Sequence, residues 1–166
     1  MIAELEKEDI DQVKAIFTSF PHHFNKLGLI QLDEDLVNYI ELNNYSKICF
    51  FVEKETNQVL GVIGYKRRIN PYEFEITWLA VRRDVQKKGI GKKLFLHLEE
   101  RVKSIGCETL IVNVPDDIAS ISFYEKMGFI ESGELSSDNK LVYKKITKTW
   151  RPTFKPREVM GGFENE

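Results

Sequence analysis

Residues 75–95, EITWLAVRRDVQKKGIGKKLF, constrain the fold more than any other stretch of this chain. An apolar run predicts a strand, a basic turn with two glycines follows, and apolar residues at helical spacing then predict a helix. Glycines let the backbone approach a ligand closely, and a helix that begins there directs free N–H groups and the positive end of its dipole at that ligand. The turn therefore predicts a site for a phosphate-bearing ligand. Between residues 82 and 93 a single acid, Asp84, stands against six basic residues: Arg82, Arg83, Lys87, Lys88, Lys92 and Lys93.

The turn has a recognisable pattern. It lacks the GxxxxGK-Ser/Thr pattern of the P-loop and the GxGxxG fingerprint of dinucleotide-binding proteins. It instead resembles the Q/R-x-x-G-x-G/A signature of the GNAT acetyltransferase superfamily, with Gln86, Gly89 and Gly91 at the signature positions. A second block, SFYEKMGF at residues 122–129, resembles the YEKxGF element of the same family. Both blocks lie in the expected order, and the resemblance covers roughly residues 1–147.

This resemblance implies a fold and a reaction. The fold would be α/β (α+β), with a mixed, mostly antiparallel central sheet flanked by helices on both faces. The protein would be an acyltransferase that moves the acetyl group of acetyl-CoA directly to a primary amine of a small molecule or peptide, with no acyl-enzyme intermediate. The acceptor stays open among small amines, peptide N-termini and lysine side chains. A non-catalytic acyl-CoA-binding module is the alternative, and a domain whose basic turn contacts nucleic-acid phosphates is a weaker one.

Composition and charge narrow the class of protein. With 42% hydrophobic residues and a net charge of −2, the chain predicts one globular domain without a general attraction to nucleic acid or to anionic membranes. Cys49 and Cys107 lie in apolar surroundings, which favours reduced core cysteines. The charged N-terminus lacks the apolar segment of a signal peptide, no apolar run is long enough for a membrane span, and no residue cluster has metal-ligand spacing. We therefore expect a cytoplasmic protein.

The periodicity along the chain predicts a β-α-α-β-β-β-α-β-α-β-β order. Strands are expected at residues 1–7, 47–53, 59–69, 73–81, 109–114, 129–134 and 140–146. Helices are expected from a cap at Asp9 to before Pro21, from about Asp33 to Asn43, from the glycine turn to Gly106, and over residues 119–127.

A C-terminal tail is expected at residues 148–166, where proline and glycine recur and periodicity is lost. Trp150, Phe154 and Phe163 are costly to leave exposed. We therefore expect the tail to pack on the body or on a second subunit of a homodimer.

The resemblance also assigns residues to the coenzyme. The turn would cradle the pyrophosphate through Gln86, Lys87, Lys88, Gly89, Ile90, Gly91 and Lys92. Backbone groups of Leu79, Ala80 and Val81 would pair with the pantetheine arm, which would lie between strands 73–81 and 109–114. The N–H of Val81, or one beside it, would stabilise the oxyanion. An asparagine common in the family is replaced by Asp117, which can accept but not donate a hydrogen bond, and Asn113 is a substitute for that contact.

Two residues are candidates for proton transfer. A period of two places Glu75 on one strand face with Leu79 and Val81, where partial desolvation would make it a better base for the acceptor amine; the alternative is a solvated carboxylate. Tyr124 matches the tyrosine of YEKxGF, which serves the leaving thiolate; the alternative is a core aromatic residue. Because a phenol is a weaker acid than a thiol, stabilisation of sulfur by a hydrogen bond is as plausible as outright protonation.

Overall fold

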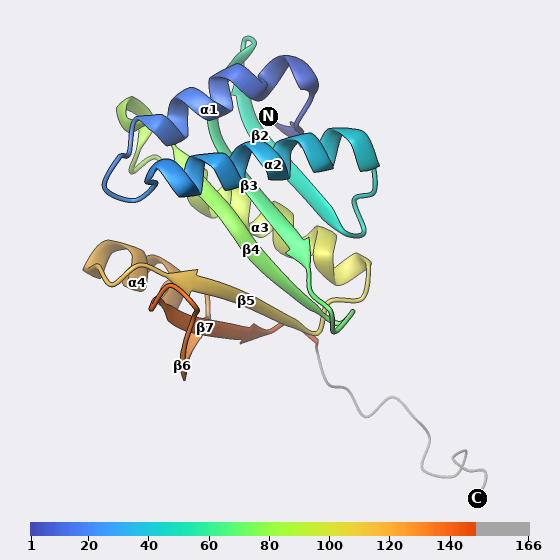
Figure 1. Ribbon diagram of the computed structural model, residues 1–166, viewed down its shortest axis with the longest axis vertical. Helices are drawn as coiled ribbons and strands as arrows, with labels where there is room; N and C mark the ends of the chain where they lie inside the picture. The colour runs from blue at the N-terminus through green and yellow to red at the C-terminus, as the bar shows by residue number, and fades with distance from the viewer. Residues whose placement is uncertain (149–166) are drawn as a thin grey trace, which may run out of the picture.

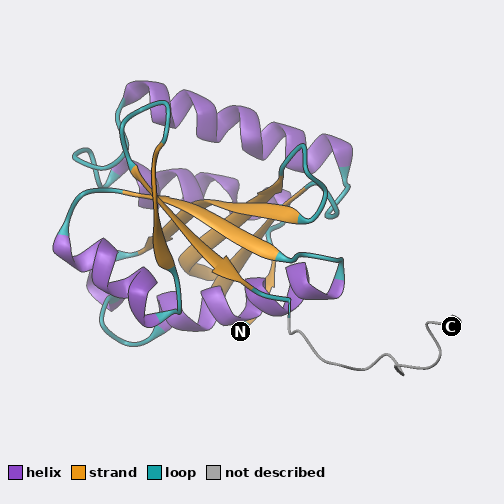
Figure 2. Cartoon of the chain, turned by 90° about the horizontal axis from the view of Figure 1, so that it is seen from below, coloured by secondary structure: helices purple, strands orange, loops and turns teal. Residues whose placement is uncertain are grey.

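The computed structural model describes residues 1–148, which form one seven-stranded sheet with helices on both sides (Figures 1 and 2). The strand order is β1-β2-β3-β4-β5-β7-β6. Neighbouring strands are antiparallel except β4 and β5, so the expected mixed, mostly antiparallel sheet is confirmed. The strands are β1 (Ile2–Glu4), β2 (Ile48–Glu55), β3 (Gln58–Arg67), β4 (Glu73–Val81), β5 (Thr109–Val114), β6 (Ile130–Leu135) and β7 (Leu141–Ile146).

Four α-helices cover the sheet. They are α1 (Ile10–Thr18), α2 (Lys26–Leu42), α3 (Ile90–Ser104) and α4 (Ile118–Lys126), with short 3₁₀ turns at Lys7–Asp9 and Arg83–Val85. Helices α1 and α2 lie side by side on one face of the sheet (Figure 1). Helix α3 packs against β2, β3 and β4 on the other face, and its neighbour there is α4.

One expected helix start and one expected side-chain cap are corrected. Helix α2 begins at Lys26 and not near Asp33, because Asn25 acts as its N-cap and accepts a hydrogen bond from the N–H of Gly28 at 2.8 Å. Asp9 occupies the cap position of α1 but does not cap it with its side chain. Its carboxylate accepts from the N–H of Glu6 at 2.9 Å and from Lys54 Nζ at 3.1 Å, so it fastens the N-terminus to β2 instead.

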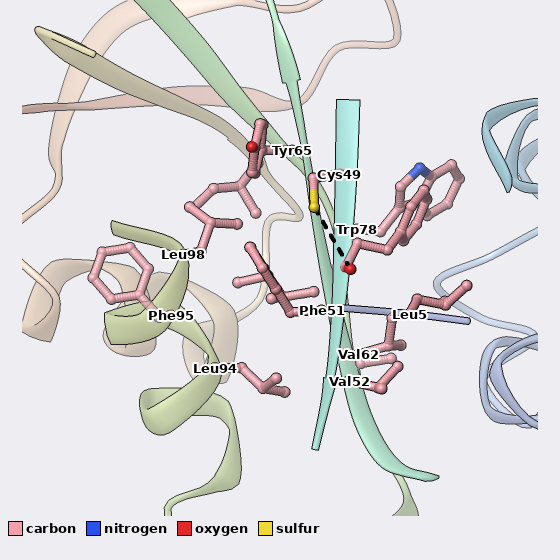
Figure 3. Packing of buried hydrophobic residues seen from close by; sticks show 14 of the residues in the cluster. Leu5, Cys49, Phe51, Val52, Val62, Tyr65, Trp78, Leu94, Phe95 and Leu98 are labelled. Carbon is pink, nitrogen blue, oxygen red and sulfur yellow. Dashed lines mark hydrogen bonds between the residues drawn. The ribbon is translucent and has the colours of Figure 1, made fainter. Parts of the chain in front are cut away.

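The core has two layers, one on each face of the sheet. Phe51 and Tyr65 lie on the α3 side with Leu94, Phe95 and Leu98, whereas Trp78 lies on the opposite side (Figure 3). Each of these side chains is buried, and burying one large apolar side chain contributes about 1.5–3 kcal/mol.

A β-bulge in β4 changes the direction of its side chains. Phe74 makes an edge-to-face contact with Tyr65, on the α3 side, at 5.6 Å between ring centroids. Trp78 contacts Phe17 of α1 at 5.5 Å, on the other side. An even separation of four residues would put Phe74 and Trp78 on one face. They lie on opposite faces because Thr77 is an extra residue: Tyr65 pairs with Ile76 and Gly64 with Trp78.

Cys49 and Cys107, both within residues 1–148, are buried and free, as expected. No helix in this part of the chain is long and apolar enough to cross a membrane, and no group of three potential ligands within it could hold a metal ion. The three aromatic residues of the expected tail, Trp150, Phe154 and Phe163, lie outside the described residues.

Candidate active site

The glycine turn joins the end of β4 to the start of α3. Gly89 has a φ of +80° and Lys87 a φ of +65°, both in the left-handed region, so the turn is tight. The side-chain amide of Gln86 donates to the carbonyl of Val81 at 3.0 Å and fastens the turn to β4. No side chain caps α3. The N–H groups of its first turn are therefore left for a ligand, beside the positive end of the helix dipole.

The basic residues around the turn divide into two groups. Arg82 pairs with Asp84 at 2.7 Å, Arg83 donates to the Ser19 carbonyl, and Lys93 lies 3.5 Å from Glu53, so these three have structural partners. The other three have no ion-pair partner among residues 1–148. These are the lysines that remain available for an anion: Lys87, Lys88 and Lys92.

Beside the turn, the last residues of β4 pair on one side only. The parallel ladder with β5 ends at Ile76 and Val112, and the two strands diverge beyond that point (Figure 1). Arg82 donates its N–H to Leu60 of β3 at 2.8 Å. Because N–H directions alternate along a strand, the N–H groups of Leu79 and Val81 point away from β3, toward the side where β5 has diverged.

This alternation separates the three residues that were assigned to the pantetheine arm. Leu79 and Val81 have backbone groups on the open side of β4, so their assignment remains a prediction with suitable geometry. Ala80 has the same N–H direction as Arg82 and lies opposite Val62 in the β3 ladder. We therefore find the N–H of Ala80 engaged with β3 and not available to a ligand.

Tyr124 lies near the turn on α4. Its neighbour Phe123 packs over Gly91, since a Cβ at Gly91 would lie 3.5 Å from the Phe123 ring. The Tyr124 side chain is 7% exposed and contacts the rings of Phe123 and Phe129 at 5.1 and 5.5 Å. Burial raises the pKa of Tyr124. The residue is therefore both a core aromatic and a phenol that stays protonated across the neutral range.

Asp117 has a structural partner in the described chain. It is the N-cap of α4 and accepts from the N–H and the hydroxyl of Ser120 at 2.8 and 3.0 Å. Its carboxylate also lies 3.4 Å from Nε2 of His23, in the loop between α1 and α2. Partial burial favours the neutral acid, but the Ser120 hydrogen bonds outweigh it and the pKa of Asp117 is lowered. Contact between Asp117 and a coenzyme stays a prediction.

The face of Glu75 was predicted wrongly. Because Thr77 is inserted between them, Glu75 does not share a face with Leu79 and Val81, and it lies instead on the α1/α2 face, opposite Lys66 of β3. The expected desolvation is nevertheless present. Burial raises the pKa of Glu75, while the nearby charges of Arg68 and Lys66 oppose that shift. A partly buried carboxylate of this kind can act as a general base.

Several neighbours of Glu75 were not anticipated from the sequence. Arg68 lies 3.1 Å from one carboxylate oxygen, and the Asn113 amide lies 3.5 Å from the other, which is long for a hydrogen bond. The Asn113 side chain therefore faces this carboxylate, and its contact with a coenzyme in place of Asp117 stays a prediction. A second carboxylate, Asp35 of α2, is buried nearby. The sequence did show polar residues such as Glu75 and Asn113 within apolar strand segments. It did not show what they contact, because their partners are distant in sequence.

Known proteins share the sequence profile and the fold of this chain. Residues 11–129 match the sequence profile of the Acetyltransferase (GNAT) family. The chain is 36% identical over 63 residues to the uncharacterized N-acetyltransferase YvbK of Bacillus subtilis (strain 168). These residues are 37% of this chain and 41% of YvbK, so the chain spans less than half of that relative.

Solved structures show the same fold. A GNAT-family protein from Desulfovibrio desulfuricans superposes with a TM-score of 0.81 at 16% identity, over 89% of this chain and 99% of that one. The PaiA N-acetyltransferase of Thermoplasma acidophilum, solved in complex with coenzyme A, superposes with a TM-score of 0.70 at 19% identity, over 88% and 98% of the two chains. The family profile spans well over half of the chain and both motifs lie within it. The chain therefore belongs to the GNAT acetyltransferase family.

Proposed function

We propose that this protein is an N-acetyltransferase that moves the acetyl group of acetyl-CoA directly to a primary amine of a small molecule or peptide. The observation that carries the proposal is the uncapped N-terminus of α3 directly beside the unpaired end of β4. The first feature suits a pyrophosphate, and the second suits an extended amide-bearing arm that adds to the sheet like a strand.

The chain would hold the donor through backbone and charge. The turn from Gln86 to Lys92 would bind the pyrophosphate with its N–H groups, assisted by Lys87, Lys88 and Lys92. Leu79 and Val81 would hydrogen-bond the pantetheine amides from the open side of β4. The reacting carbonyl would then lie near the N–H of Val81, which is placed to stabilise the oxyanion.

The transfer itself needs a neutral amine and a stabilised leaving group. Glu75 would take a proton from the acceptor ammonium, directly or through water, and the free amine nitrogen would attack the thioester carbonyl carbon. The carbon–sulfur bond then breaks, the amide forms, and coenzyme A leaves as the thiol once its sulfur is protonated. Because burial raises the pKa of Tyr124, we assign the phenol a hydrogen bond to the developing thiolate rather than outright protonation of it.

Binding and turnover should be measured separately. Thermal unfolding with acetyl-CoA, coenzyme A, NAD and ATP side by side should show stabilisation by the first two ligands. An amine screen with thiol detection should then find an acetyl acceptor. Stabilisation without turnover on any amine would favour a non-catalytic acyl-CoA-binding module. Salt-dependent binding to nucleic acid, unaffected by coenzyme A, would contradict the proposal.

Tyr124→Phe tests the role of the phenol. The hydroxyl has no hydrogen-bond partner among residues 1–148, so stability and acetyl-CoA affinity should be unchanged. Turnover should fall at least about tenfold at every pH below the thiol pKa, because a hydrogen bond to a charged group is lost only as charge develops on sulfur. Tyr143→Phe, the same change on a buried tyrosine of β7, is the control and should keep full activity. Unchanged turnover in Tyr124→Phe would reduce Tyr124 to a core aromatic.

The proposal includes a cellular setting and an assembly. Two buried free cysteines suit a reducing compartment, so we place the enzyme in the cytoplasm. We assign residues 1–147 to the acetyltransferase domain. We assign residues 148–166 to a tail that packs on the body or on a second copy of the chain through its three aromatic side chains.

Deletion of residues 149–166 tests the tail. It spares Thr147, whose hydroxyl donates to the Cys107 carbonyl at 3.0 Å, and the pair of Lys148 with Glu108 at 3.3 Å. We expect the truncated protein to have lost dimerisation in sedimentation velocity, or to be less soluble than the parent. Its thermal shift with acetyl-CoA should be preserved. A truncated protein with the parental sedimentation and melting temperature would contradict a packing role for the tail.

A further inference from the structure

A buried carboxylate lies between helix α2 and the sheet. Asp35 is 1% exposed and accepts three hydrogen bonds or ion-pair contacts. Trp78 Nε1 donates to it at 2.7 Å, Gln31 Nε2 at 2.9 Å, and Lys66 Nζ lies at 2.7 Å. A buried charge persists only when it is paired in this way. One of its partners, Lys66, is also a neighbour of the proposed base.

Lys66 and Glu75 occupy directly opposed positions on β3 and β4. Side chains at opposed positions of an antiparallel pair have their Cβ atoms about 4.5–5.5 Å apart, so an ion pair between the two is sterically available. The ammonium of Lys66 is nevertheless directed to Asp35. The only ion pair of Glu75 within residues 1–148 is with Arg68, whose side chain is 44% exposed, where water weakens the attraction.

The other groups around Glu75 come from four elements. Glu73 precedes it on β4 and lies 3.9 Å from the same Arg68. Asn113 of β5 is neutral, and Asp138, in the β6–β7 turn, raises the pKa of Glu75 as Asp35 does, though less than burial. Lys66 already lowers the pKa of Glu75 through its charge, although its ammonium is paired with Asp35. Release of Lys66 would therefore allow this cation to move into a direct ion pair with Glu75, as a second one beside that of Arg68.

We propose that Asp35 is a positioning residue of the acetyl-transfer site: by holding Lys66, it keeps the opposed ammonium off Glu75 and leaves that carboxylate free to accept a proton. The inference rests on the proposed function, in which Glu75 is the base. A carboxylate paired with a second cation would be a weaker base and would lose efficiency at neutral pH.

Asp35→Asn tests the inference without any acceptor. In a ¹³C NMR titration, the Glu75 carboxyl signal, assigned by its loss in Glu75→Gln, reports the protonation midpoint directly. We expect the midpoint to fall by about one pH unit or more in Asp35→Asn, because a negative charge is removed and Lys66 is released toward Glu75. The double variant Asp35→Asn/Lys66→Met should return toward the parental midpoint. Gln31→Met, which removes a neutral donor to Asp35, is the matched control and should leave the midpoint unchanged.

An unchanged Glu75 midpoint in folded Asp35→Asn would overturn the inference. If that variant does not fold, the ¹⁵N signal of Lys66 Nζ in the parent chain decides instead. A signal unaffected by Glu75→Gln supports the hold of Asp35 on Lys66, and a signal that moves with Glu75 ionisation overturns it.

The acetyl-transfer pH profile separates this inference from the proposed function. In Asp35→Asn, the acidic limb of kcat/KM should move to lower pH with the NMR midpoint. Full activity of Glu75→Gln would refute Glu75 as the base, and with it the catalytic meaning of Asp35, even if the midpoint moves. If Glu75→Gln loses activity but the acidic limb of Asp35→Asn does not move, Glu75 remains the base. Only the positioning role of Asp35 is then overturned.

Discussion

Glu75→Gln is expected to lower kcat/KM at neutral pH by on the order of 10²-fold or more. The substitution keeps size and polarity but removes the group that accepts the proton. A base works only when deprotonated, and burial raises the pKa of Glu75. The acidic limb of the parental rate should therefore lie at higher pH than an ordinary glutamate would give. The variant should lose that limb and recover at high pH, where the acceptor amine is neutral unaided. Initial rates from about pH 5 to 10 measure both effects.

Glu73→Gln is the matched control for this experiment. Glu73 lies on the same strand and contacts the same Arg68, and the exposures of the Glu73 and Glu75 side chains are similar, 31% and 25%. We expect its pH profile to overlay that of the parent. Parental rates for Glu75→Gln throughout would instead leave the deprotonation to bulk water or to Glu73. A profile for Glu75→Gln parallel to that of Tyr124→Phe would also refute the base. Loss of the base is rescued as the acceptor amine becomes neutral, whereas loss of the phenol persists at every pH below the thiol pKa.

Gly89→Asp is expected to abolish the thermal shift with acetyl-CoA. A Cβ at Gly89 meets no atom within 4 Å, so the side chain fits, but its carboxylate would stand where the pyrophosphate approaches. At 100 times Kd, the ligand stabilises the parent by about 2.7 kcal/mol, all of which should be lost. Without ligand, stability should fall only modestly, by about 1–2 kcal/mol, because φ at this position is +80°.

Two further glycine variants separate charge from strain. Gly106→Asp also has a positive φ, +101°, and open space, but lies at the opposite end of α3, so it should keep the acetyl-CoA shift. Gly91 has no unusual φ, and an acidic side chain in the first turn of a helix is stabilised by the helix dipole, so Gly91→Asp introduces charge without strain. Its unliganded stability should therefore be preserved while acetyl-CoA binding is lost. Normal acetyl-CoA binding by both Gly89→Asp and Gly91→Asp would remove the coenzyme from this turn.

The strand, turn and helix around residues 75–95 were predictable because their signals are local. Gly89 and Gly91 mark a turn by their backbone freedom, and the helical period of α3 is read within a few residues. The start of α2 was misplaced because its cap, Asn25, precedes a segment of mixed polarity that does not display the helical period. Of six basic residues in the turn, the sequence could not say which are engaged, because the partners Ser19 and Glu53 come from distant elements.

The sequence by itself determined the order of the elements, the motifs that identify the family and the place of the anion-binding turn, since each is encoded by neighbouring residues. Only the tertiary structure decided which face Glu75 occupies. The bulge at Thr77 shifts the side-chain period by one residue, and a shift of one exchanges the two faces of a strand. That exchange places Glu75 beside Lys66 and near Asp35, an arrangement that depends on the pairing of β4 with β3 and on the packing of α2.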